Sequence, residues 1–115
     1  MSEQDRLRSM LKKIEDIEYF ISGVDGQIVR ALSDRTLKPA IRMQLIVLSE
    51  DFTRLTQEGA FEILAHFNRD DIKGLNAVRN FIAHDYDSVD DDILEIVIRK
   101  HLPLIKNDLQ AAMKA

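Results

Sequence analysis

The sequence predicts an all-α protein, an antiparallel bundle of four main helices with short helical pieces between them. Apolar residues recur three and four positions apart through most of the chain, which is the helical spacing, and no segment shows the alternation of a strand. The composition, 45% hydrophobic and 31% charged, is typical of a soluble globular protein with many exposed helical faces. At 115 residues we expect a single domain, residues 1–115, around one core.

The first predicted helix runs from about Asp5 to Ser22 and ends at Gly23. Its apolar face consists of Leu7, Met10, Leu11, Ile14, Ile17 and Ile21. A shorter helical piece is predicted at Gln27–Leu32, with Asp25 as a possible cap.

The third helix has the clearest start signal, because Thr36 can act as its N-cap and Pro39 falls in the first turn, which needs no amide donor. Residues spaced alternately four and three apart form a seam suited to antiparallel packing: Ile41, Leu45, Leu48, Phe52 and Leu55. This helix should continue to about Gln57, and Glu58–Asn68 should form another short one.

Asp70 and Asp71 are expected to cap a helix from Ile72 to about Tyr86. An acidic loop, 87–92, follows, and its carboxylates favour the start of a helix that continues to about His101. Pro103 should interrupt that helix and begin the last one.

Several function classes are disfavoured by composition. There is no cysteine, which removes disulfides, thiolate catalysis and cysteine-ligated metals. The three histidines lie far apart without a metal-binding spacing, so we expect neither a metal nor another cofactor. The net charge of −4 argues against a non-specific grip on nucleic acid, so that any RNA contact would be local. No apolar run is long enough to span a membrane and no signal peptide is evident, which predicts a cytoplasmic protein.

The segment from Arg79 to Tyr86 is chemically the most informative. With Ile72 set at 0° on a helical wheel, the apolar residues Leu75 and Val78 fall at about 300° and 240°. Arg79 and Tyr86 fall at about 340° and 320°, inside that apolar arc. Because a charge in an apolar environment is costly unless it is paired, this position indicates a cleft or a subunit interface.

A polar stripe lies beside this arc, formed by Asn76, Asn80 and His84 at about 40° to 120°. Arg79 and His84 are about 140° apart, so a joint site needs a long arginine reaching round, a helix that ends near His84, or a second subunit across a two-fold axis. The plain alternative is equally compatible with the pattern: an arginine whose stem is partly buried, a capping histidine and a core tyrosine.

Arg79-x4-His84-x-Tyr86 resembles the Rx4HxY signature of HepT-like toxins, a branch of the HEPN superfamily of helical ribonucleases. The resemblance covers most of the chain. It includes Asp5–Leu7 with Ile14–Ile17 in the first helix, Arg42–Leu45 with Leu48–Glu50 in the long central helix, and Val89-Asp90 with Leu102-Pro103 near the C-terminal end.

This resemblance implies a HEPN-like homodimer whose Arg–His motifs face each other across the two-fold axis. The implied activity is metal-independent endoribonuclease cleavage, in which a 2′-hydroxyl attacks the adjacent phosphate and leaves a cyclic phosphate. In such a reaction His84 would transfer protons and Arg79 would stabilise the charge of the phosphorane. Asn80 would orient His84 or bind a phosphate oxygen, and Asn76 would contact the RNA substrate.

The resemblance also implies a toxin–antitoxin pair, with a cognate minimal nucleotidyltransferase as the antitoxin that adds adenylate to Tyr86. The acidic loop could dock a basic surface of that partner, or it could serve only to cap the following helix. Two other classes of function stay open. One is a non-catalytic accessory subunit that binds a nucleotide or positions a substrate for a nucleotidyltransferase, and the other is a purely structural dimerisation bundle.

Overall fold

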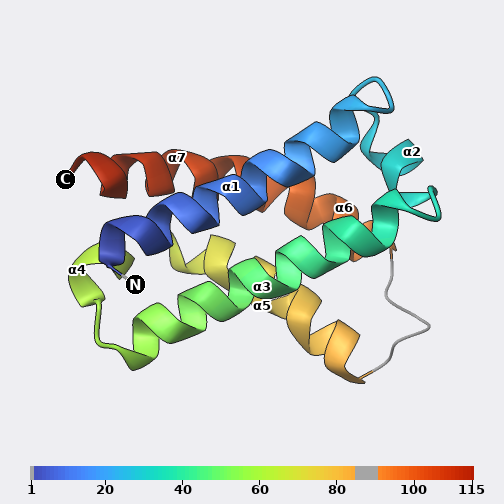
Figure 1. Cartoon of the computed structure of the whole chain (residues 1–115). Helices are drawn as coiled ribbons and strands as arrows, with labels where there is room; N and C mark the ends of the chain where they lie inside the picture. The colour runs from blue at the N-terminus through green and yellow to red at the C-terminus, as the bar shows by residue number, and fades with distance from the viewer. Residues whose placement is uncertain (1, 85–90) are drawn as a thin grey trace.

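The computed structural model describes residues 2–84 and 91–115, with the backbone alone for residues 81–84, and in these ranges every regular element is helical (Figure 1). The all-α prediction is therefore confirmed. The elements are α1 (Glu3–Ser22), α2 (Ile28–Leu32), α3 (Leu37–Gln57), α4 (Phe61–Leu64), α5 (Arg69–His84), α6 (Asp91–Ile96), the π-helical turn η1 (Val97–His101) and α7 (Leu102–Lys114).

The long helices alternate in direction, which makes the bundle antiparallel (Figure 1). Helix α1 packs on α3 and on α7, and both of these run opposite to it. Helix α5, which carries the candidate motif, packs on α3 on one side and on η1 and α7 on the other. The short α2 packs on α6. The motif helix is thus positioned by two separate parts of the chain.

The core is formed by the apolar faces predicted from the helical spacing. All five seam residues of α3 are at most 2% exposed: Ile41, Leu45, Leu48, Phe52 and Leu55. From α1, the buried residues are Leu7, Met10, Ile14, Ile17 and Ile21. The rings of Phe52 and Phe67 pack nearly at right angles, with centroids 4.9 Å apart, so Phe67 anchors the segment that joins α4 to α5 on the core.

Three of the predicted helix caps are wrong, and two of them concern the long helices α3 and α5. Thr36 precedes α3 but its side chain makes no capping bond, and Asp34 instead accepts hydrogen bonds from the amides of Thr36 and Leu37 at 2.8 and 2.9 Å. Asp70 and Asp71 do not cap α5, because the helix begins earlier, at Arg69, and Asn68 Oδ1 accepts from the Asp70 amide at 2.8 Å. In both cases a carboxylate or amide two positions upstream reaches the free amides first.

Two short segments also differ from expectation. The helix predicted at Glu58–Asn68 is limited to α4, because Gly59 turns the chain with a φ of 72° and a second turn follows Leu64. Asp25 makes no cap for α2, since it lies in a left-handed turn with a φ of 58° beside Gly26.

Pro103 does not interrupt the helix that contains it, contrary to the prediction. Instead α6 passes through η1 into α7, and the Leu102 amide donates to the carbonyl of Val97, five residues earlier. A wider turn of this kind accommodates a proline, which has no amide hydrogen of its own and clashes with the preceding turn of a regular α-helix. No helix in the described ranges has the length and apolar character needed to cross a membrane.

Candidate functional site

Helix α5 is held in the bundle by apolar residues on one face. Leu75 and Val78 are fully buried and face the core, whereas Lys73, Arg79 and Asn80 are exposed. The centre of the buried face lies near Leu75 and Val78, at about 270° on the helical wheel. Arg79, at about 340°, therefore lies at the margin of the buried face and reaches solvent in the single chain. The arc deduced from sequence was centred too close to the arginine.

The exposed Arg79 has no acidic partner among the described residues, whereas several other cations of the chain are paired. Asn80, next to it, is exposed as well and makes no described hydrogen bond. A guanidinium group with its five donors and a neighbouring amide are consequently available for an external ligand. His84 is the last described residue of α5, and the structure describes only the backbone of His84, Ile82 and Ala83. Tyr86 and most of the acidic loop lie outside the described residues.

The side chain of Asn76 is held by a hydrogen bond from α3, made by a residue that the sequence pattern did not indicate. Ser49 of α3 is completely buried, and its hydroxyl donates to Asn76 Oδ1 at 2.6 Å. With its oxygen occupied, the half-buried Asn76 presents its amide nitrogen as the free end. Of the predicted polar stripe, Asn76 and Asn80 thus share one side of α5, and Asn76 is the better fixed.

A buried pair holds the beginning of the same helix. Asp71 is 4% exposed and His101 of η1 is 8% exposed, and Asp71 Oδ1 lies 2.8 Å from His101 Nδ1. The ring lies directly on Gly74, where an added Cβ would be 2.5 Å from both Cδ2 and Nε2 of the histidine. The absence of a side chain at Gly74 therefore allows α5 to approach η1 closely enough for the pair to form.

Sequence reasoning missed Ser49, Asp71, Gly74 and His101. A signal was present for two of them. Ser49 is a polar residue beside Leu48 on the apolar face of α3, and His101 follows Val97 and Ile98 at helical spacing on a buried face. A polar group on an apolar stripe indicates a buried hydrogen bond, but the partner of that bond is not readable from one sequence.

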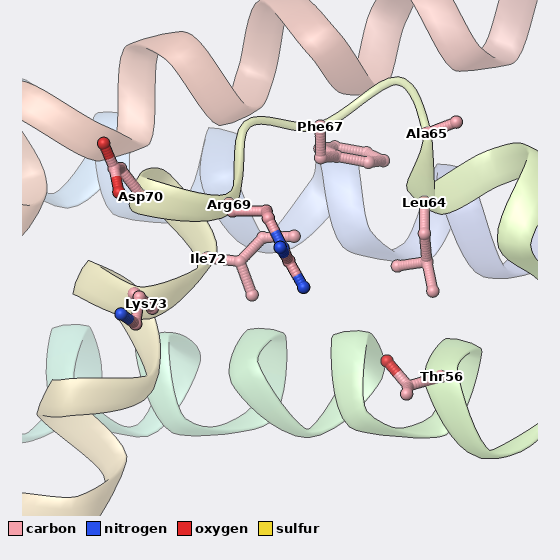
Figure 2. A pocket seen from close by; sticks show the side chains of 8 residues that line it. All are labelled: Thr56, Leu64, Ala65, Phe67, Arg69, Asp70, Ile72 and Lys73. Carbon is pink, nitrogen blue, oxygen red and sulfur yellow. The ribbon is translucent and has the colours of Figure 1, made fainter.

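A cavity of about 870 Å³ opens at the other end of α5 from the motif. It lies between the end of α3, the α4–α5 connection and the first turns of α5, and Figure 2 shows the side chains that line it. Its wall combines apolar and polar groups, chiefly Thr56, Leu64, Phe67, Arg69, Ile72 and Lys73. Within the described ranges, no three His, Asp or Glu side chains gather closely enough to hold a metal ion.

The fold defines the class of the protein as an all-α bundle, in which α5 carries an exposed arginine and an exposed asparagine a few residues before a histidine. A comparison with protein-family models identifies the class further, since the model described as "Ribonuclease HepT-like" matches residues 10–112. The chain therefore belongs to the HepT-like ribonuclease family. No curated protein matches it significantly, and no solved structure does so either.

Proposed function

We propose that this protein is the toxin of a toxin–antitoxin pair and acts as a metal-independent endoribonuclease. Membership of a ribonuclease family gives the class of activity. The observation that carries the proposal is that Arg79 and Asn80 are exposed and have no described partner, on the helix whose last described residue is His84. A free guanidinium group and a histidine on the same helix would together meet the needs of phosphodiester cleavage, namely charge stabilisation and proton transfer.

In the proposed reaction a ribose 2′-oxygen attacks the adjacent phosphorus while His84 accepts the hydroxyl proton. The bond from phosphorus to the 5′-oxygen then breaks, and the leaving oxygen takes up a proton. The products are a 2′,3′-cyclic phosphate and a 5′-hydroxyl. Arg79 stabilises the added negative charge of the phosphorane by a forked pair of hydrogen bonds. Asn80 orients His84 or binds a phosphate oxygen, and Asn76 contacts the substrate through its free amide nitrogen.

The proposed active unit is a homodimer in which the two α5 helices face each other. Within one chain, Arg79 and His84 are about 140° apart around the helix, so that one small phosphate group cannot meet both directly. A second α5 across a two-fold axis supplies the missing side of the cleft. It also covers the exposed margin of α5 around Arg79.

We further propose that a nucleotidyltransferase antitoxin inactivates the enzyme by adenylylating Tyr86. The tyrosine oxygen would attack the α-phosphorus of ATP bound by the transferase, and pyrophosphate would leave. A nucleotide attached two residues after His84 adds bulk and negative charge where the substrate phosphate should bind.

The test is RNA cleavage by the purified protein in the presence of EDTA, with the product ends analysed for a cyclic phosphate. His84→Ala should abolish cleavage, while His66→Ala should not, because His66 is exposed and does not line the cavity. Sedimentation of the same samples should give the mass of a dimer or of a larger assembly of dimers. Equal cleavage by His84→Ala would refute the catalytic proposal. A tight complex with the transferase, without any nuclease activity of the unmodified protein, would instead select the accessory-subunit function.

A further inference from the structure

We propose that the cavity at the beginning of α5 is a binding subsite for the RNA strand next to the bond that is cleaved. In this subsite Arg69 and Lys73 bind backbone phosphate, and the apolar wall receives a base. The inference rests on the proposed ribonuclease function and adds a second contact region, on the same helix as the motif but at its opposite end.

The two cations of the cavity are available for a ligand. Arg69 and Lys73 are both exposed, and neither forms an ion pair with any carboxylate in the described ranges. Asp70 also contributes to the wall, but its carboxylate points away from the guanidinium group of Arg69 (Figure 2). Arg69 extends into the space between the α4–α5 connection and α3, where a bound phosphate would meet it (Figure 2).

The rest of the wall suits a nucleobase. Leu64 and Ile72 are half-buried and present apolar surface, and the edge-on contact with Phe52 fixes the ring of Phe67 behind them. Thr56 of α3 adds a hydroxyl at the opposite side of the space (Figure 2). The volume of about 870 Å³ lies within the range of roughly 300–1,000 Å³ that is typical of small-ligand sites, so it holds one nucleotide with room for its neighbour.

The subsite is continuous with the motif along one face of α5. Arg69, Lys73, Asn76 and Asn80 follow each other at intervals of four, three and four residues, at about 60°, 100°, 40° and 80° on the helical wheel. No carboxylate lies in this sector, because Asp70 and Asp71 fall at about 160° and 260°. The ten residues from Arg69 to Arg79 span about 15 Å of helix, a length that a few nucleotides of single-stranded RNA can cover.

The distribution of charge over the chain also favours RNA binding at this subsite. The chain carries a net charge of −4, so its overall field repels RNA, and affinity has to come from a local group of unpaired cations. Arg6, Lys13 and Lys106 have their charge compensated by Glu58, Asp51 and Glu18. Other exposed cations without a described ion pair, such as Arg35 and Lys100, lie on different elements. Helix α5 alone carries three exposed cations without a described ion pair, namely Arg69 and Lys73 on this face and Arg79 next to it.

The test compares RNA binding by two charge-matched double variants, both in the cleavage-inactive His84→Ala background. The first is Arg69→Gln/Lys73→Gln. The control is Arg35→Gln/Lys100→Gln, which removes the same charge from two exposed cations that lie outside the cavity and have no described partner. The probe is a fluorescent single-stranded RNA of 12 nucleotides, and binding is followed by anisotropy over a range of salt concentrations.

We expect Arg69→Gln/Lys73→Gln to weaken binding at least tenfold and to lower the slope of log K against log salt by about 1.4, the value for two lost phosphate contacts on a single strand. The control should weaken binding less than twofold. In the active background, cleavage of the same RNA should become less efficient in Arg69→Gln/Lys73→Gln and should be nearly unchanged in the control. Equal weakening by the two double variants would overturn the subsite, since only net charge would then matter.

A second measurement locates the RNA directly. A 4-thiouridine placed two to four nucleotides from the cleaved bond should cross-link, on irradiation, to the peptide that contains residues 64–73. Cross-links confined to other peptides would overturn the subsite even if the protein cleaves RNA normally. If the parent protein neither binds nor cleaves any RNA, the proposed function itself fails, which is a distinct result.

Discussion

His101 and Asp71 form a buried pair, with Nδ1 and Oδ1 2.8 Å apart, although they are 30 residues apart in the chain. Removing either partner would leave the other polar group buried without its hydrogen bond, which is costly. The pair joins the first turn of the motif helix to the π-turn of the C-terminal segment. The direction of α5, and with it the position of Arg79, therefore depends on a contact that contains no residue of the motif.

Gly74→Ala should destabilise the fold by about 1–3 kcal/mol, because the new Cβ would lie 2.5 Å from the His101 ring and force it away from Asp71. In a helix without this ring the same substitution is favourable by up to about 1 kcal/mol. In the His101→Ala background we therefore expect Gly74→Ala to be neutral or stabilising. Urea unfolding of the two single variants and the double variant measures the coupling. Equal effects of Gly74→Ala in both backgrounds would contradict it.

Asp34 gives a prediction about pH. Hydrogen bonds from the backbone amides of Leu37 and Thr36 hold the pKa of its carboxyl group below the ordinary value of 3.8. Since the folded pKa is below the unfolded one, the contribution to stability is fully present above the unfolded pKa and is lost as pH falls through the folded value. Asp34→Asn keeps an acceptor oxygen but no titrating charge. Its melting temperature should therefore differ from that of the parent mainly above pH 4, and the difference should shrink in stronger acid. A difference that is constant from pH 7 to pH 2 would contradict this account.

Arg79→Lys should lose most of the ribonuclease activity while the fold and the net charge are preserved. A point charge on a flexible stem cannot reproduce the planar fork that the proposed phosphorane contact requires. Because Arg79 is exposed in the single chain, the melting temperature of the isolated fold should be nearly unchanged. The measurement is kcat/KM on a short RNA, with circular dichroism as the control for folding. Near-full activity would mean that Arg79 provides only a general positive field.

Tyr86→Phe should leave RNA cleavage largely intact but prevent inactivation by the nucleotidyltransferase. The variant lacks only the oxygen that would receive the adenylate. Intact mass after incubation with the transferase and ATP should increase in steps of one adenylate for the parent and stay constant for the variant. If the variant is inactivated as readily as the parent, inhibition comes from complex formation and not from modification.

The helical spacing of apolar residues was sufficient to predict the bundle, because burial of one face decides where each long helix lies. All five residues of the α3 seam are buried as expected. Local polar chemistry was less predictable. Asp34 caps α3 in place of Thr36, and Asn68 caps α5 in place of Asp70. Several neighbouring residues could satisfy the turn geometry that such a cap needs, so the sequence does not decide between them.

In the candidate site, too, some residues could be predicted from the sequence and others could not. Asn76, Arg79 and Asn80 could be selected from sequence because they follow one another along α5. The contacts of Ser49 with Asn76 and of His101 with Gly74 could not be predicted from sequence. Each contact joins residues more than 25 positions apart, so the packing of two helices has to be known first. The degree of exposure of Arg79 also required the structure, since the wheel gives an angle but not the position of the neighbouring helix.

Because the π-turn at Val97–His101 sets the rotation of α7 relative to α6, the number of residues in this turn is as important for the fold as their identity. Deleting one residue there would turn His101 and everything after it by about 100° relative to α6, and the ring would leave Asp71 and Gly74. Residues 33–36, between α2 and α3, are exposed and could accept an insertion without such a rotation of the core. We therefore expect natural variation in length to be tolerated at that connection and excluded from the π-turn.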